Sequence, residues 1–150
     1  MADPKISWQV LERINENDEE YIPTRNYTED DSYTSGQYVQ KRFRVWNNYY
    51  GSTDVDDALD CKLILAFKNY EDNFLLHLIN VKVNEGDWVV PNIDTDRGVV
   101  DMKDLSGLAN NGTNANAANF CEIEINIGPL PRNMRCELKS LYFYIEYKKQ

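Results

Sequence analysis

The sequence contains one histidine and three cysteines, and this scarcity excludes several common kinds of active site. A nucleophilic Ser or Cys needs a base beside it, and His77 stands in an apolar run, where a hydrogen-bonded structural role is expected. No two cysteines have the C-x-x-C spacing of zinc and redox motifs. The sequence also lacks a G-x-S-x-G motif and a glycine-rich phosphate loop. We therefore predict no catalytic residues, no cofactor and no metal, so the chain is not expected to be an enzyme.

Basic residues are outnumbered as well, since 16 Lys and Arg stand against 25 Asp and Glu, a net charge of −9. Nucleic acids and anionic membrane surfaces attract Lys and Arg, so neither is an expected partner. The longest mostly apolar stretch, residues 74–83, is interrupted by polar residues and is too short to span a bilayer. Any ligand is expected to be neutral or cationic.

The acidic clusters do not have the spacing of a calcium loop. In the run Asn92-x-Asp94-x-Asp96, positions six and twelve fall on Arg97 and Lys103, whereas an EF-hand needs Gly and Glu there. The run at residues 54–57 has several carboxylates without a ligand pattern. Both runs are interpreted as solvated acidic loops.

The cysteines Cys61, Cys121 and Cys136 each stand in an alternating apolar run, which favours small buried core residues. Cys121 and Cys136 could face each other across a hairpin, so a disulfide between them is a second interpretation. The odd number of cysteines and a first segment without an apolar core favour a reducing compartment.

Alternation of apolar and polar residues dominates the 150-residue sequence. A period of two is typical of strands with one face in the core and one in water. No stretch has a sustained helical pattern, and only short turns are expected, at residues 56–60 and 102–108. The sequence predicts a single all-β domain over residues 1–150, an antiparallel β-sandwich of jelly-roll or Ig-like type with six to eight strands. An open barrel is the alternative. The expected inward rows are Ile6, Trp8, Val10; Val39, Phe43, Val45; Cys61, Leu63, Leu65, Phe67; Ile79, Val81, Val83; Cys121, Ile123, Ile125, Ile127; and Leu141, Phe143, Ile145, Tyr147.

Two segments depart from this alternation. Residues 14–36 are polar and acidic but contain several tyrosines, and they are expected to form a long acidic loop. This loop is either functional or attached to the sandwich by its tyrosines. Residues 106–119 are rich in Asn, Ala and Gly and are expected to be a flexible loop.

Four tyrosines are candidate binding residues. Tyr49 and Tyr50 follow Trp46-Asn47-Asn48 at a turn, where core packing does not explain both. Exposed aromatic rings at loop tips stack on sugars or anchor a protein partner, although one ring could simply cover the end of the sandwich. Tyr142 and Tyr144 occupy outward positions of the last strand, where a solvated face would be polar.

Short segments between residues 38 and 147 resemble a recurring domain of bacteriophage tail and virion structural proteins. Such domains combine an F-R-I/V-W-N-N strand, a Gly-containing turn and a D-V-x-D-A segment, followed by a Trp after a Gly. Ser-Gly and Asn-Gly loops, a Glu-bearing strand and a terminal I-x-Y strand complete the pattern. The matching segments here are Phe43-Arg44-Val45-Trp46-Asn47-Asn48, Gly51, Asp54-Val55-x-Asp57-Ala58, Gly86-Asp87-Trp88, Ser106-Gly107, Asn111-Gly112, Cys121-Glu122-Ile123 and Ile145-Glu146-Tyr147.

This resemblance implies a structural part of a phage particle, in the tail or adsorption apparatus, that is assembled in the host cytoplasm. The implied partners are other virion proteins or further copies of the chain itself. Tyr49 and Tyr50 depart from the pattern, which has Lys and Gly there, and residues 1–37 have no counterpart. A carbohydrate-binding module that uses exposed tyrosines, with a cell-surface glycan as partner, is the alternative function, and an acidic hydrolase is a distant third.

Overall fold

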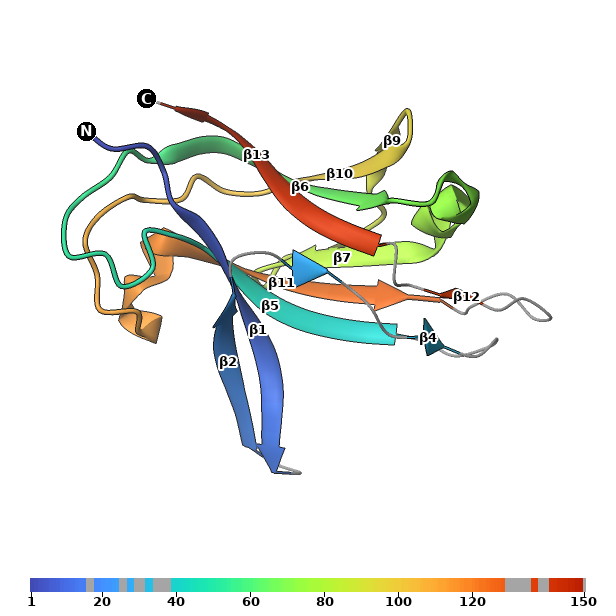
Figure 1. Ribbon diagram of the computed structural model, residues 1–150, viewed down its shortest axis with the longest axis horizontal. Coiled ribbons are helices and arrows are strands. Elements are labelled where there is room, and N and C mark those ends of the chain that lie inside the picture. Colours follow the sequence, from blue (N-terminus) through green and yellow to red (C-terminus); the bar gives the residue numbers. More distant parts are fainter. Residues whose placement is uncertain are drawn as a thin grey trace.

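Two antiparallel β-sheets form the body of the protein in the computed structural model (Figure 1), which describes residues 1–15, 18–24, 27–28, 32–33, 39–128, 136–137 and 141–149. The six-stranded sheet has, in spatial order, β2 (Asp18–Thr24), β1 (Ile6–Asn15), β5 (Val39–Asn47), β11 (Phe120–Ile127), β7 (Ile79–Val83) and β8 (Trp88–Val89). The five-stranded sheet has β3 (Tyr27–Thr28), β13 (Leu141–Lys149), β6 (Ala58–Phe67), β10 (Arg97–Asp101) and β9 (Asn92–Asp94). A small separate pair joins β12 (Cys136–Glu137) to β4 (Ser32–Tyr33).

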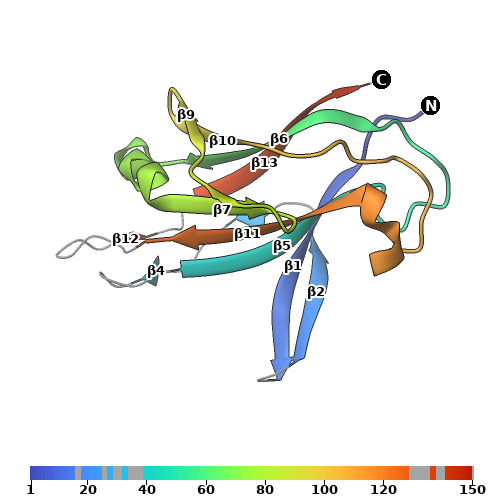
Figure 2. The ribbon, with the colours of Figure 1, turned by 180° about the vertical axis from the view of Figure 1, so that it is seen from behind.

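The predicted all-β sandwich is confirmed, because the two sheets face each other across one apolar core. Figures 1 and 2 show β6, β10 and β13 in one layer and β1, β5, β7 and β11 in the other. The sheets contain more strands than predicted. Beyond the six predicted rows, the sheets contain β2 and β10, of seven and five residues, and β3, β8 and β9, which are only two or three residues long and too short for alternation to reveal them.

Strand register explains why most of the inward rows are buried, while Ile6, Val10, Val83, Ile145 and Tyr147 are partly buried and pack against the core. Phe43 on β5 stands opposite Ile123 on β11, and Leu65 on β6 stands opposite Phe143 on β13. The Phe43 and Phe143 rings meet across the core with centroids 5.5 Å apart. All six residues that the alternation places deepest are buried: Leu63, Leu65, Phe67, Ile123, Ile125 and Phe143.

The outer face of the six-stranded sheet has the polar pattern that alternation predicted. Arg44 pairs with Glu122 at 2.8 Å and Arg42 with Glu124 at 3.7 Å, in each case directly across the β5–β11 ladder. Opposite charges at facing positions stabilise antiparallel strands by roughly 0.2–1 kcal/mol per pair. This face is therefore held by cross-strand ion pairs.

The segment predicted as a long acidic loop at residues 14–36 is in part a hairpin. β2 pairs along β1 from Trp8 opposite Thr24 to Asn15 opposite Asp18, and the far end of the hairpin projects from the two layers (Figure 1). Away from the core, backbone hydrogen bonds alone can form a strand pair, so no apolar alternation marks it. Residues 16–17, 25–26, 29–31 and 34–36 lie outside the described part of the chain.

Two short 3₁₀ helices lie where the sequence predicted an apolar run and a flexible loop. η1 (Tyr70–Leu78) contains His77, which is exposed on a helix and not within an apolar strand. Leu75 and Leu76 are adjacent and both buried, which strict strand alternation does not allow. η2 (Asn114–Asn119) occupies the segment predicted as a flexible loop. The short turns expected at residues 56–60 and 102–108 instead contain the antiparallel bridge between Ala58 and Leu105.

The chain crosses from one sheet to the other between β8 and β9, at Val90 and Pro91 (Figure 2). Pro91 is buried, and a Cβ added to Gly98 on β10 would lie 2.9 Å from the Pro91 Cβ. Gly98 is thus the residue that lets the crossing segment approach the five-stranded sheet. This crossing brings the edges of both sheets to the same side of the sandwich.

We expect Leu63→Ala to lower the free energy of unfolding by about 2–5 kcal/mol, because it leaves a cavity in the buried core. The matched control is Leu108→Ala, since Leu108 is 57% exposed and its truncation is expected to stay within about 0.5 kcal/mol of wild type. Urea unfolding followed by circular dichroism measures both. Equal effects of the two substitutions would contradict the core assignment.

Candidate binding surfaces

Three buried asparagines hold the loops together at the end of the sandwich where the two chain ends lie. The Asn47 amide nitrogen donates to the carbonyls of Asp56 and Leu105, at 3.0 and 3.1 Å, and its oxygen accepts from the Lys5 N–H at 2.9 Å. Asn48 donates to the carbonyls of Thr53 and Gly107, each at 2.9 Å. This cluster is named the asparagine staple and consists of Asn47, Asn48 and Asn119.

Asn119 completes the staple from the end of η2. Its amide nitrogen lies 2.8, 2.9 and 3.3 Å from the carbonyl oxygens of Ser106, Leu108 and Asn47. A buried carbonyl without a partner is costly, so one side chain stabilises the whole segment between β10 and β11. The segment predicted to be flexible is therefore anchored at several points.

The acidic run at residues 54–57 is tied to the same segment. Asp54 accepts from the Ala109 N–H and Asp57 from the Gly107 N–H, both at 2.8 Å. Asp54 is exposed, as its interpretation as part of a solvated loop predicted, whereas Asp57 is half-buried, and both carboxylates also bond to backbone across the turn. Among the described residues, no group of three or more His, Cys, Asp or Glu side chains is placed to hold a metal ion.

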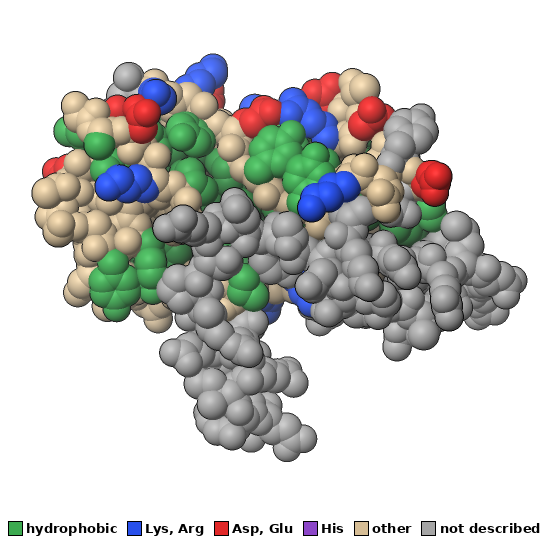
Figure 3. All heavy atoms as spheres, in the orientation of Figure 1, with side chains coloured by type: hydrophobic (Ala, Val, Ile, Leu, Met, Phe, Trp, Pro, Cys, Tyr) green, Lys and Arg blue, Asp and Glu red, His purple; other side chains and the backbone are tan. Residues whose placement is uncertain are grey.

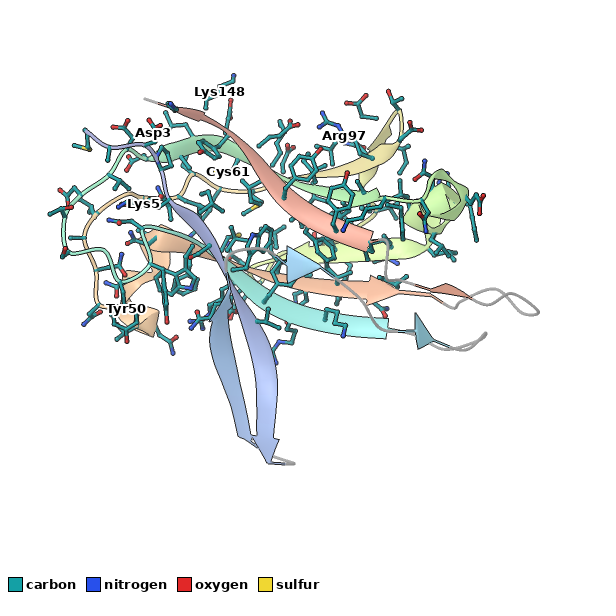
Figure 4. All side chains as sticks on the ribbon, in the orientation of Figure 1. Asp3, Lys5, Tyr50, Cys61, Arg97 and Lys148 are labelled. Atoms are coloured by element: carbon teal, nitrogen blue, oxygen red, sulfur yellow. The ribbon has the colours of Figure 1, made fainter. Side chains whose placement is uncertain are left out.

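Tyr49 and Tyr50, the first predicted pair of binding residues, occupy this loop end but differ in exposure. Tyr49 packs edge-on against Trp46 at 4.8 Å and its hydroxyl accepts from Gln9, while burial raises its pKa. Tyr49 thus covers the end of the sandwich. Tyr50 is 63% exposed and is labelled at this end in Figure 4. Its backbone has a φ of 57°, which is uncommon for a residue with a side chain.

Tyr142 and Tyr144, the second predicted pair, lie on the outer face of the five-stranded sheet as expected. Their rings are nearly parallel, with an interplanar angle of 16° and centroids 5.9 Å apart. Arg97 reaches them from β10 and donates to the Tyr144 hydroxyl at 3.1 Å (Figure 4). Arg97 also pairs with Glu146 and, at 3.4 Å, with Asp94. The bonds to Glu146 and Tyr144 raise the pKa of the guanidinium.

These side chains border a hollow of about 270 Å³, named here the tyrosine hollow. Figure 3 shows hydrophobic side chains on this face set among charged ones. Aromatic rings beside fixed carboxylates and a guanidinium offer both stacking and hydrogen bonding to a polar ring. The residues that line the hollow are Ala66, Phe67, Asp94, Thr95, Asp96, Arg97, Tyr142 and Tyr144.

A third candidate surface, at the edges of the two sheets, contains none of the predicted binding residues. The neighbouring edges of the two sheets expose Trp88, Val89, Val90 and Ile93, by 47, 44, 57 and 41% respectively. These four residues are named the open edge. A second hollow of about 440 Å³ lies against it, lined by Val83, Gly86, Asp87, Val89, Val90, Asn92, Val99, Val100 and Asp101.

A local sequence signal for the open edge does exist. The apolar run Trp88-Val89-Val90 ends at Pro91, and a proline next to an apolar run favours an edge strand over a central one. The run contains only three residues, so alternation cannot be counted in it. Its exposure follows from its place at the edge, which is a property of the whole fold.

The cysteines do not form a reactive site in the described part of the chain. Cys61 and Cys121 are free and buried, and burial raises the pKa of each thiol to about 11. Because only the thiolate is strongly nucleophilic, these groups are inert at neutral pH. The suggested disulfide between Cys121 and Cys136 is wrong, since the Cys121 thiol is free and its strand pairs with β5 and β7. The side chain of Cys136 lies outside the described set.

Comparisons with protein-family models, curated proteins and solved structures gave no match to this chain. Among the described residues, no helix is long and apolar enough to cross a membrane.

We expect Asn119→Ala to lower the free energy of unfolding by about 1–3 kcal/mol, because it removes the donor to the carbonyls of Ser106 and Asn47 at a buried position. Asn111→Ala is the matched control, since Asn111 is exposed in the same segment. Thermal and urea unfolding of both variants measure the difference. Equal stability of Asn119→Ala and wild type would show that the staple does not hold this end.

Proposed function

We propose that this chain is a non-enzymatic structural component of a bacteriophage virion, in the tail or adsorption apparatus. It binds other virion proteins or further copies of itself and is assembled into particles in the host cytoplasm. The phage-like motifs between residues 38 and 147 support the virion assignment. The observation that carries the binding role is the open edge.

Edge strands with exposed apolar side chains are sites of association. β8 and β9 are the last strands of their sheets, and no described strand pairs with their outer sides. Native proteins normally protect such edges with charge, a bulge or a covering segment, because an unpaired strand recruits other chains. Here Trp88, Val89 and Val90 are consecutive and exposed. A partner that covers them would remove apolar surface from water and stabilise the complex.

The asparagine staple and the acidic turn have structural roles that fit the resemblance. The W-N-N and D-V-x-D segments of the phage-like pattern supply Asn47, Asn48 and Asp57, which bond to neighbouring backbone. These motif residues thus hold the loops at this end of the sandwich, which is a structural role. Motifs of this kind are expected in a scaffold that works by presenting a surface.

We expect Val90→Asp to be lost from particles, because it places a charge on the apolar edge. The control is Leu108→Asp, since Leu108 and Val90 are each 57% exposed and Leu108 lies in the loop between β10 and β11. Virions produced from the genome that encodes this chain are purified, and their proteins are quantified by mass spectrometry. Wild type and Leu108→Asp should be present in equal amounts.

Absence of the wild-type chain from purified particles would overturn the virion assignment. Normal incorporation of Val90→Asp would leave that assignment in place and show that the open edge is not the contact. Circular dichroism of the purified variants separates a lost contact from a lost fold.

A carbohydrate-binding function is the second candidate, and the tyrosine hollow is the observation that favours it. Tyr142 and Tyr144 supply two stacking rings, while Asp94, Asp96 and Arg97 supply acceptors and donors along the same hollow. Sugar rings are recognised by this combination of an apolar platform and fixed polar groups. The candidate glycan site is the outer face of the five-stranded sheet and not the loop-tip pair, because Tyr49 packs against Trp46 and covers the end of the sandwich.

If this candidate is correct, Tyr142→Ala should weaken glycan binding about tenfold, a loss of roughly 1.4 kcal/mol from one stacking ring. Tyr50→Ala serves as the control, since Tyr50 is an exposed tyrosine at the loop end. Glycan arrays and pull-down with host cell walls measure binding. Lack of any binding by wild type would eliminate the candidate, and loss with Tyr50→Ala alone would move the site to the loop end.

A further inference from the structure

The apolar core continues into the open edge without being closed there. Val89 stands opposite Val81 and Ile93 opposite Gly98, so both residues occupy inward positions of their sheets. Val81 is buried, yet Val89 and Ile93 are 44 and 41% exposed. Inward positions with such exposure are expected where a sandwich lacks a covering strand.

The hollow beside these residues is lined by both sheets. Val100 belongs to the core and Val83 packs against it, and both line the hollow, whose other borders are the β7–β8 turn, β8, β9 and β10. The outer sides of β8 and β9 have no described partner. An extended segment suits this place, since it can pair with a strand edge and insert alternate side chains.

Charge distinguishes between the possible occupants. The charged residues among those lining the hollow are Asp87 and Asp101. Asp101 pairs with Lys62 at 2.7 Å and its side chain remains mostly exposed. A second copy would bring another net charge of −9 to this acidic rim, and like charges at an interface are costly. A segment with Lys or Arg would be attracted to the same rim.

We propose that the open edge receives an extended segment of another virion protein, in which apolar side chains alternate with Lys or Arg. The segment adds to the edge of β8 or β9, its apolar side chains cover Val89 and Ile93, and its basic side chains face Asp87 and Asp101. This inference rests on the proposed function and specifies the chemistry of the partner at that surface.

The test uses a synthetic nine-residue peptide with blocked ends, Val at odd positions and Lys alternating with Thr at even ones. Its binding to the purified chain is followed by acrylamide quenching of tryptophan fluorescence. Trp88 is 47% exposed while Trp8 and Trp46 are buried, so quenching reports chiefly on the open edge. We expect the peptide to protect Trp88 at concentrations up to about 1 mM. Trp88→Phe confirms the assignment of the signal.

Matched peptides and variants test each part of the proposal. Replacing Lys by Glu in the peptide should weaken binding at least fivefold, and N-methylating alternate amides should abolish it. Asp87→Asn should weaken binding of the Lys peptide about two- to fivefold, which is the range expected for an exposed ion pair. Val90→Asp should weaken it more than tenfold, and Leu108→Asp should leave it unchanged.

Equal binding of the Lys and Glu peptides would contradict the proposal that the partner segment is basic. Equal binding of the Lys peptide with and without N-methylation would contradict the proposal that the segment adds as a strand. No binding by any peptide would overturn this inference, while loss of Val90→Asp from particles would still support the proposed function. A dimer in sedimentation velocity that Val90→Asp abolishes would assign the edge to a second copy and also overturn it.

Discussion

The structure depends most on three buried side-chain amides, Asn47, Asn48 and Asn119. Each bonds to backbone carbonyls of the surrounding loops. These loops contain few apolar residues, so hydrophobic burial alone does not fix them. Buried amides are stabilising only when their partners are all in place. The staple therefore works as a unit, and it determines where β5 ends, how the N-terminal segment enters and how β10 connects to β11.

The polar groups of the loop end have hydrogen-bond partners, whereas apolar side chains of the open edge remain in contact with water. At the loop end, Asp54 and Asp57 accept from backbone N–H groups, and even the carbonyl of Asn47 has a donor. At the open edge, apolar side chains in inward positions stay exposed, although burying them would be favourable. A fold that satisfies its loops this thoroughly leaves the edge as the surface where an added contact would contribute most.

The sequence predicted what depends on local alternation, and the rest arises from long-range contacts. Leu63 and Phe143 could be assigned to the core because strand alternation is visible within a few residues. Their neighbours Tyr142 and Tyr144 were correctly placed outward for the same reason, but Arg97 comes from a strand 47 residues away and could not be assigned to them. Val89 has a core-like sequence environment, and its exposure arises because no described strand lies beyond β8. The β1–β2 hairpin escaped prediction since backbone pairing away from a core needs no apolar pattern.

The net charge of −9 affects which molecules can approach the open edge. An exposed apolar edge on a neutral chain would favour edge-to-edge aggregation before assembly, because any copy could pair with any other. Repulsion between acidic copies opposes that encounter, and Asp87 lies beside the hollow where this repulsion acts at shortest range, whereas Lys62 offsets part of the charge of Asp101. A basic partner segment meets attraction at the same place. The same charges that keep copies apart would therefore select the partner, and selectivity would arise without any change in the apolar contact itself.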